Sequence, residues 1–149
     1  MGEAAVKEYR TSSPEETFLL AKELAKDAHP GSLYALDGDL GAGKTVFAQG
    51  FAEGLGIEEA VNSPTFTILQ IYDSGRLPLF HFDLYRLESE EELMEIGAEE
   101  YLCGAGVSLV EWASLFPDIL PKPYHQVRIE RLTDEGWDER RIVIREVLA

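Results

Sequence analysis

The stretch that decides the fold is Gly38-Asp39-Leu40-Gly41-Ala42-Gly43-Lys44-Thr45. It matches the pattern G-x-x-x-x-G-K-[ST] at every fixed position. Its glycines let backbone N–H groups approach phosphate oxygens, which a Cβ would obstruct. Lys44 adds a positive charge between the β- and γ-phosphates, and the Thr45 hydroxyl can ligate Mg²⁺. The stretch therefore predicts a loop that binds the phosphates of a nucleoside triphosphate.

The residues on both sides of this loop strengthen that interpretation. Residues 32–37 form a short apolar run, as expected of a strand buried in a mostly parallel sheet. After the loop, apolar residues recur at helical spacing over residues 46–55. Such a helix presents the positive end of its dipole and its free N–H groups to the phosphates. A chance match has a probability on the order of 10⁻³ to 10⁻² in a chain of this length, so we prefer phosphate binding to a simple glycine-rich turn.

Patterns elsewhere in the chain predict an α/β fold with a mixed, mostly parallel sheet. A cap, a first-turn proline and first-turn acids in Ser12-Ser13-Pro14-Glu15-Glu16 predict a helix from there to about residue 28, after a short strand at 6–10. Two strand-like runs, 66–72 and 77–84, are separated by four residues that include Gly75, which suggests an antiparallel hairpin. The other expected elements are one short helix within 88–101, a buried strand at 107–110 and a closing strand pair at 126–132 and 140–147.

Composition excludes several classes of protein. The chain has 149 residues, 45% apolar and 28% charged, which suits one globular domain over residues 1–149 and not a disordered chain. Its formal net charge of -15 argues against a free-standing nucleic-acid binder, because such affinity comes mostly from Lys and Arg. The single cysteine, Cys103, excludes an intramolecular disulfide and a thiolate-built zinc site. We expect no secretory signal, no membrane span and a cytoplasmic location.

A metal site in such a protein needs an acid at the end of a buried strand, because Thr45 supplies only one ligand. Asp83 follows the run 79–82, and Glu111 follows the run 107–110. The second run is the more continuously apolar. We therefore prefer Glu111 as the acid on the metal side and Asp83 as an acid that positions water. Either carboxylate alone could instead be a solvated group at a strand end.

Four further residues have two interpretations each. Thr65, after Ser63-Pro64, lies where many such proteins sense the γ-phosphate, although the proline also fits a simple turn. Trp112 is either a core residue or a platform for a base. His81 is expected to be structural, because its strand neighbours are apolar. Arg86 is either an internal arginine finger or, as we prefer, a salt-bridge partner.

Four motifs in this order carry a family resemblance. They are residues 38–45, Ser63-Pro64-Thr65-Phe66-Thr67, His81-Phe82-Asp83-Leu84-Tyr85-Arg86-Leu87 and Leu109-Val110-Glu111-Trp112. Together they resemble the TsaE (YjeE) family of small bacterial ATPases, which are required for threonylcarbamoyladenosine formation on tRNA. The resemblance runs from about Thr11 to the last strand pair.

The resemblance implies a three-layer sandwich with ATP and Mg²⁺ as cofactors. ATP would contact the loop residues Gly41, Ala42, Gly43, Lys44, Thr45 and Val46, with Trp112 and Thr11 nearby. Thr45 and Glu111 would hold Mg²⁺. Lys44, Asp83, Glu111 and Thr65 would serve catalysis, with Thr65 in a switch loop. The implied partners are TsaB and TsaD, downstream of a TsaC-type synthase, and tRNA would be met only indirectly.

The nearest rival prediction is a small-molecule kinase. Such enzymes usually carry arginines in a lid that closes on the phosphates. Residues 87–121 contain no Lys or Arg and nine Asp or Glu, so that lid is hard to place there. This acidic stretch could face a partner or simply form a solvated helix face. A GTPase is disfavoured, because the chain contains no Asn-Lys-x-Asp sequence to recognise guanine.

Overall fold

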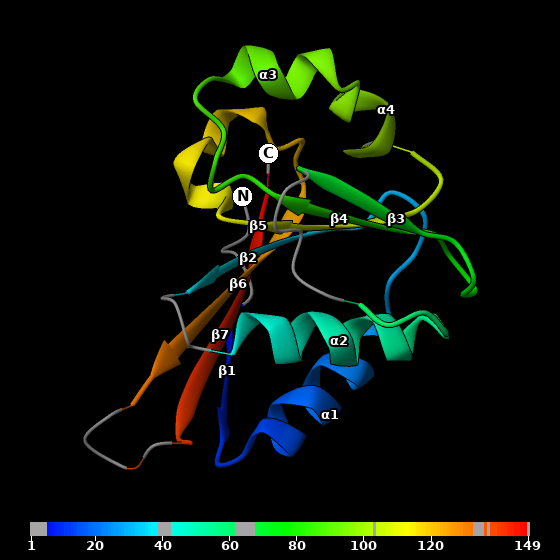
Figure 1. Ribbon diagram of the computed structural model, residues 1–149. Helices are drawn as coiled ribbons and strands as arrows, with labels where there is room; N and C mark the ends of the chain where they lie inside the picture. Colours follow the sequence, from blue (N-terminus) through cyan, green and yellow to red (C-terminus); the bar gives the residue numbers. More distant parts are fainter. Residues whose placement is uncertain are drawn as a thin grey trace.

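The computed structural model describes residues 6–38, 43–61, 68–102, 104–132, 136 and 138–148. Within this part of the chain the strands form a seven-stranded sheet in the order β1-β7-β6-β2-β5-β4-β3 (Figure 1). The strands are β1 (Val6–Thr11), β2 (Leu33–Gly38), β3 (Leu69–Tyr72), β4 (Leu79–Asp83), β5 (Val107–Glu111), β6 (Tyr124–Arg131) and β7 (Arg140–Val147). The helices are α1 (Pro14–Ala25), α2 (Lys44–Gly54), α3 (Glu90–Glu95) and α4 (Ala98–Leu102), with short 3₁₀ helices η1 (Ala113–Leu115) and η2 (Pro117–Ile119).

The sheet is mixed, with a parallel centre. Strands β6, β2, β5 and β4 run parallel to one another. At one side β7 is antiparallel to β6 and β1 is antiparallel to β7, and at the other side β3 is antiparallel to β4. This arrangement confirms the predicted sheet, including the hairpin and the closing strand pair.

Helices cover both faces of the sheet and make three layers (Figure 1). Because side chains alternate along a strand, β2 contributes to two separate cores. Tyr34 and Leu36 pack in one core with Phe47 and Phe51 of α2. The other core lies on the opposite face and combines residues of β2, β4 and β5 with α3, α4 and η1. The three-layer sandwich implied by the family resemblance is therefore the observed architecture.

Helices α1 and α2 cross at very short range. A Cβ at Gly50 would lie 2.2 Å from the carbonyl oxygen of Phe18, and one at Gly54 would lie 2.4 Å from that of Lys22. At these two positions only a hydrogen atom fits between the helix backbones. The crossing fixes α2 against α1.

Helix boundaries follow the predicted local chemistry. Ser13 caps α1, its Oγ accepting the Glu16 N–H at 3.1 Å, and Pro14 occupies the first turn. Helix α1 ends at Ala25, three residues earlier than predicted, and α2 begins at Lys44, two residues earlier. No helix in the described part of the chain is long and apolar enough to cross a bilayer.

The acidic segment differs from the single short helix that the sequence predicted. It forms two helices, α3 and α4, separated at Gly97, whose φ of 75° is a left-handed conformation that favours glycine. Ile96, expected in the buried stripe, is 38% exposed, because it lies at the break. Leu93 of α3, which belongs to the same expected stripe, is buried, and so is Leu102 of α4.

Candidate functional site

The start of α2 lies after the carboxyl end of β2. Gly43 caps the helix with φ 110°, a left-handed conformation that L side chains rarely adopt. Among the described residues, a Cβ there would meet the Arg140 Nε alone, 4.0 Å away, so backbone conformation rather than space selects glycine. Lys44 is the first helical residue and is 7% exposed, whereas Thr45 is exposed and Val46 half-buried. The positive end of the helix dipole gives this edge a positive potential.

Two acids end neighbouring parallel strands at the same edge. Asp83 is the last residue of β4 and Glu111 the last of β5, and their Cα atoms are register partners. By strand alternation Leu79 lies on the same face as Asp83, and Leu109 on the same face as Glu111. Both leucines pack in the core beneath α2. Both carboxylates therefore lie on the face of the sheet that α2 covers.

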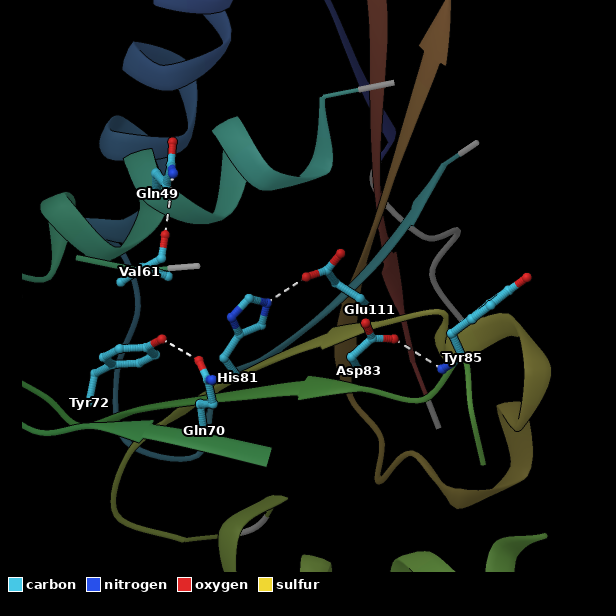
Figure 2. Close-up of polar contacts among 8 residues, drawn as sticks. All are labelled: Gln49, Val61, Gln70, Tyr72, His81, Asp83, Tyr85 and Glu111. Carbon is cyan, nitrogen blue, oxygen red and sulfur yellow. Dashed lines mark hydrogen bonds and ion pairs between the residues drawn. The ribbon is translucent and has the colours of Figure 1, made fainter. Parts of the chain in front are cut away.

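Glu111 is buried and bonded to a histidine. Its Oε2 lies 2.6 Å from the Nε2 of His81, and the two residues are 3% and 0% exposed (Figure 2). The sequence interpretation of His81 as a structural residue missed this contact. A usable signal was present, because His81 and Asp83 are two residues apart on one strand and so share a face.

Asp83 is less buried than Glu111 and has a different partner. Its Oδ1 accepts the backbone N–H of Tyr85 at 3.0 Å (Figure 2). Burial raises the pKa of this carboxyl above its usual value of 3.8; the Tyr85 N–H opposes the shift, and the nearby Glu111 charge adds to it. His81 and Lys44 act weakly in the lowering direction on the same pKa, so the groups of this edge interact electrostatically.

Trp112 places an aromatic ring against the lysine. It adopts φ 60° and ψ 32°, uncommon for a residue other than glycine, and its N–H donates to the Leu36 carbonyl at 3.3 Å. The Lys44 Nζ lies 3.7 Å from the centroid of the Trp112 ring, a cation–π distance. The Tyr85 ring centroid is 4.9 Å from that of Trp112. Strained backbone of this kind clusters at functional sites.

A buried aspartate holds the segment that follows Trp112. Asp37, near the end of β2, is 6% exposed and its Oδ1 accepts the Ser114 N–H of η1 at 3.2 Å. By strand alternation Asp37 lies on the face opposite to Glu111. It therefore supports the left-handed turn at Trp112 from below, a role that the sequence analysis did not assign.

Thr11 and Arg140 are register partners on β1 and β7, and Arg140 lies beside Gly43. Thr11 ends β1, is 4% exposed, and its Oγ1 lies 2.7 Å from the Oγ1 of Thr17. Its register partner on β7 is Arg140, the residue beside Gly43. No motif marked Arg140, because its approach to the loop depends on the pairing of β1, β7 and β6.

The donor set of this edge suits a hard cation. The Thr45 hydroxyl and the Asp83 and Glu111 carboxylates offer only oxygen, the ligand Mg²⁺ prefers. The bond to His81 uses the Oε2 of Glu111 and leaves Oε1 for another contact. Among the described residues no three His, Cys, Asp or Glu side chains cluster as a ready metal site.

Comparison with known proteins decides the family. A protein-family model described as "Threonylcarbamoyl adenosine biosynthesis protein TsaE" matches residues 11–142. The chain belongs to the TsaE family.

Relatives named "tRNA threonylcarbamoyladenosine biosynthesis protein TsaE" support this membership. The Bacillus subtilis (strain 168) TsaE is 54% identical over 134 residues, covering 90% of this chain and 82% of the relative. The Treponema pallidum (strain Nichols) TsaE is 46% identical over 104 residues, covering 70% of this chain and 76% of the relative. A solved structure described as "Crystal structure of Bacillus subtilus YdiB" superposes with a TM-score of 0.84 at 45% identity, covering 99% of this chain and 89% of that chain.

These findings confirm the predicted family and fold. Most of the predicted site residues gather around the start of α2: Gly43, Lys44, Thr45, Val46, Asp83, Glu111 and Trp112. Thr11 lies beside them with its hydroxyl bonded to Thr17. Gly41, Ala42 and Thr65 lie outside the described residues. Trp112, interpreted as either a core residue or a platform for a base, packs partly buried against the second core and contacts the Lys44 ammonium.

Proposed function

We propose that this TsaE-family chain binds ATP with Mg²⁺ and hydrolyses it, and that hydrolysis drives turnover of an assembly of TsaB and TsaD during threonylcarbamoyladenosine formation on tRNA. The assembly acts downstream of a TsaC-type synthase in the cytoplasm, and tRNA is met indirectly. One observation carries the proposal. The buried Lys44 begins α2 at the edge where Asp83 and Glu111 end their parallel strands.

The loop and helix α2 bind the phosphates in this proposal. By the sequence motif, Gly41, Ala42 and Gly43 would offer backbone N–H donors to the phosphates. Lys44 would leave the Trp112 ring to pair with the β- and γ-phosphates. A phosphate oxygen carries negative charge and can accept a charge-assisted hydrogen bond from the ammonium, which the neutral Trp112 ring cannot. Val46 and Thr11 lie at the margins of the nucleotide, and Trp112 is then released toward the base.

The acids divide the remaining work. Thr45 and Glu111 would hold Mg²⁺, which neutralises charge on the β- and γ-phosphates when bound. Asp83 is half-buried with a raised pKa, which suits a group that accepts a hydrogen bond from water and can take up a proton. Thr65 senses the γ-phosphate. We expect slow hydrolysis by the isolated chain, because a partner often completes stabilisation of the transferring group.

Reconstitution tests the proposal. Threonylcarbamoyladenosine formation on tRNA is followed with TsaB, TsaD and the synthase, with and without this chain, together with phosphate release. We expect product beyond the first turnover to require the chain. The Lys44→Ala and Glu111→Gln variants should fail to support this further product formation. Product formation that is indifferent to the chain would overturn the proposal. Transfer of phosphate to an added small molecule would favour the kinase alternative.

A further inference from the structure

We propose that His81 is a positioning residue for Glu111: it holds the buried carboxylate apart from Asp83, so that the two acids perform separate tasks. The inference rests on the proposed function, since it assigns His81 a role in how this site receives Mg²⁺ with the nucleotide. It uses the 2.6 Å contact between the His81 Nε2 and the Glu111 Oε2.

The register of β4 and β5 creates a problem that His81 solves. Asp83 and Glu111 are direct Cα partners, and side chains at such positions are within contact range. Two carboxylates there repel each other, and the Glu111 charge indeed raises the pKa of Asp83. A mechanism that gives each acid its own task needs their oxygens directed to different places.

Two donors on β4 and the turn after it direct the carboxylates in opposite directions. His81 lies two residues before Asp83, and its Nε2 is hydrogen-bonded to the Glu111 carboxylate. Tyr85 lies two residues after Asp83, and its N–H holds the Asp83 carboxylate. Figure 2 shows the two bonds leaving the pair of acids on opposite sides. The Glu111 carboxylate is thereby directed back toward His81, and the Asp83 carboxylate forward toward Tyr85.

Burial makes the histidine contact decisive for Glu111. With 3% exposure, its carboxylate has almost no water to satisfy it, and an unpaired buried charge is costly. The two ring nitrogens of His81 have different surroundings: the Nε2 faces the Glu111 Oε2, whereas the Nδ1 is buried without a hydrogen-bond partner in the described part of the chain. A neutral imidazole has one N–H donor and one acceptor, so the Nε2–H tautomer places the donor against the Glu111 oxygen. One Glu111 oxygen is fixed in place and the other is presented to the site.

Nucleotide titrations with and without Mg²⁺ test the role. Calorimetry with ADP gives the factor by which Mg²⁺ raises affinity. We expect His81→Leu to reduce that factor about tenfold or more, as loss of a partner to a metal ligand usually does. Affinity without Mg²⁺ should be retained. His81→Gln, whose amide N–H can replace the Nε2 donor, should restore most of the factor.

A double-variant cycle separates a role through Glu111 from a role in packing. If His81 acts through Glu111, the Mg²⁺ factor of His81→Leu combined with Glu111→Gln equals that of Glu111→Gln alone. Further loss in the double variant would overturn the proposal, as would an unchanged factor in His81→Leu. His125→Leu is the matched control, because His125 lies on β6 opposite Tyr34, near the amino end of β2. Its Mg²⁺ factor should match that of the unaltered chain.

The contact itself can be tested without nucleotide. Nitrogen-15 NMR of the histidine rings should show His81 as the Nε2–H tautomer, with a resonance that moves in Glu111→Gln. An Nδ1–H tautomer, or a His81 resonance with the same chemical shift in Glu111→Gln, would overturn the proposal. This test remains available even if both His81 variants fail to fold. Retained ADP affinity in Lys44→Ala would instead defeat the proposed function, and it would leave this NMR result standing.

Discussion

At the first position of α2 the Lys44 ammonium lies 3.7 Å from the centroid of the Trp112 ring. The residue type and its place at the start of a helix follow from the motif, but the ring beneath it does not. Trp112 reaches Lys44 because β5 ends beside β2 and because Trp112 itself adopts a left-handed backbone conformation directly after Glu111. The contact holds the buried Lys44 ammonium at the place where phosphate is proposed to bind.

Lys44→Ala tests the phosphate site at this scale. Removing the ammonium deletes a charge-assisted contact worth about 1.5–3 kcal/mol, so ADP and ATP affinity should fall about tenfold to a hundredfold. Calorimetry with each nucleotide measures it. Lys26→Ala is the control, because Lys26 is exposed and paired with Glu23. The nucleotide affinity of this variant should equal that of the unaltered chain. Equal affinities in the two variants would refute the phosphate-binding loop.

Asp83→Asn tests the burial of the second acid through pH. Because the folded-state pKa of Asp83 is raised, the folded protein binds this proton more tightly than the unfolded chain. Stability attributable to Asp83 is therefore lost as pH rises from about the usual value of 3.8 through the raised pKa. The variant avoids that loss.

Thermal unfolding between pH 3 and 7 measures this difference. We expect the melting temperature of Asp83→Asn to exceed that of the unaltered chain near neutral pH and the gap to close as pH falls toward 3.8. Asp118→Asn, at an exposed position of η2, should track the unaltered chain at every pH. A gap that widens on acidification would contradict the assigned direction of the shift.

At the scale of elements, local chemistry predicted most of the helices and strands. The Ser13 cap and Pro14 set the start of α1, and short apolar runs marked β2, β4 and β5. The break at Gly97 was missed because apolar residues on both sides continue a helical spacing. The bond between His81 and Glu111 could not be predicted locally, since it depends on the register of β4 against β5, which tertiary packing sets.

Gly50→Ala tests the crossing of α1 and α2. Alanine should favour the helix by about 1 kcal/mol in isolation. Here its Cβ would lie 2.2 Å from the Phe18 carbonyl oxygen, so the helices must separate. We expect a net loss of about 2 kcal/mol in the free energy of unfolding, measured by urea denaturation. Glu53→Ala, on the exposed surface of the same helix, should cost under about 1 kcal/mol. A stabilised Gly50→Ala would show that the helices do not cross so closely.

At the scale of the whole molecule, net charge limits the affinity of the isolated chain for nucleic acid. Its 28 acidic and 13 basic side chains give a net charge of -15. Composition alone predicted this limit, and the family comparison places the chain among proteins named for a tRNA modification. The two facts agree if other proteins hold the tRNA.

Binding of tRNA to the isolated chain is the matching measurement. We expect a Kd above about 10⁻⁴ M at physiological salt, the weak end of non-specific binding, because few cations are present to displace counterions. Fluorescence anisotropy of labelled tRNA measures it. Adding TsaB and TsaD provides the comparison. Saturation by the chain alone at low micromolar concentration would require a direct contact with tRNA.

The strand order also governs what happens during synthesis. Strand β2 is complete after Gly38, but its neighbours β5 and β6 extend to Glu111 and Arg131. While the ribosome translates the intervening sequence, β2, the central strand of the sheet, has neither edge paired. Open edges of apolar strands invite pairing with other chains. A product truncated before β6 therefore retains the phosphate loop and the acids of β4 and β5, yet it is a candidate for aggregation and chaperone capture.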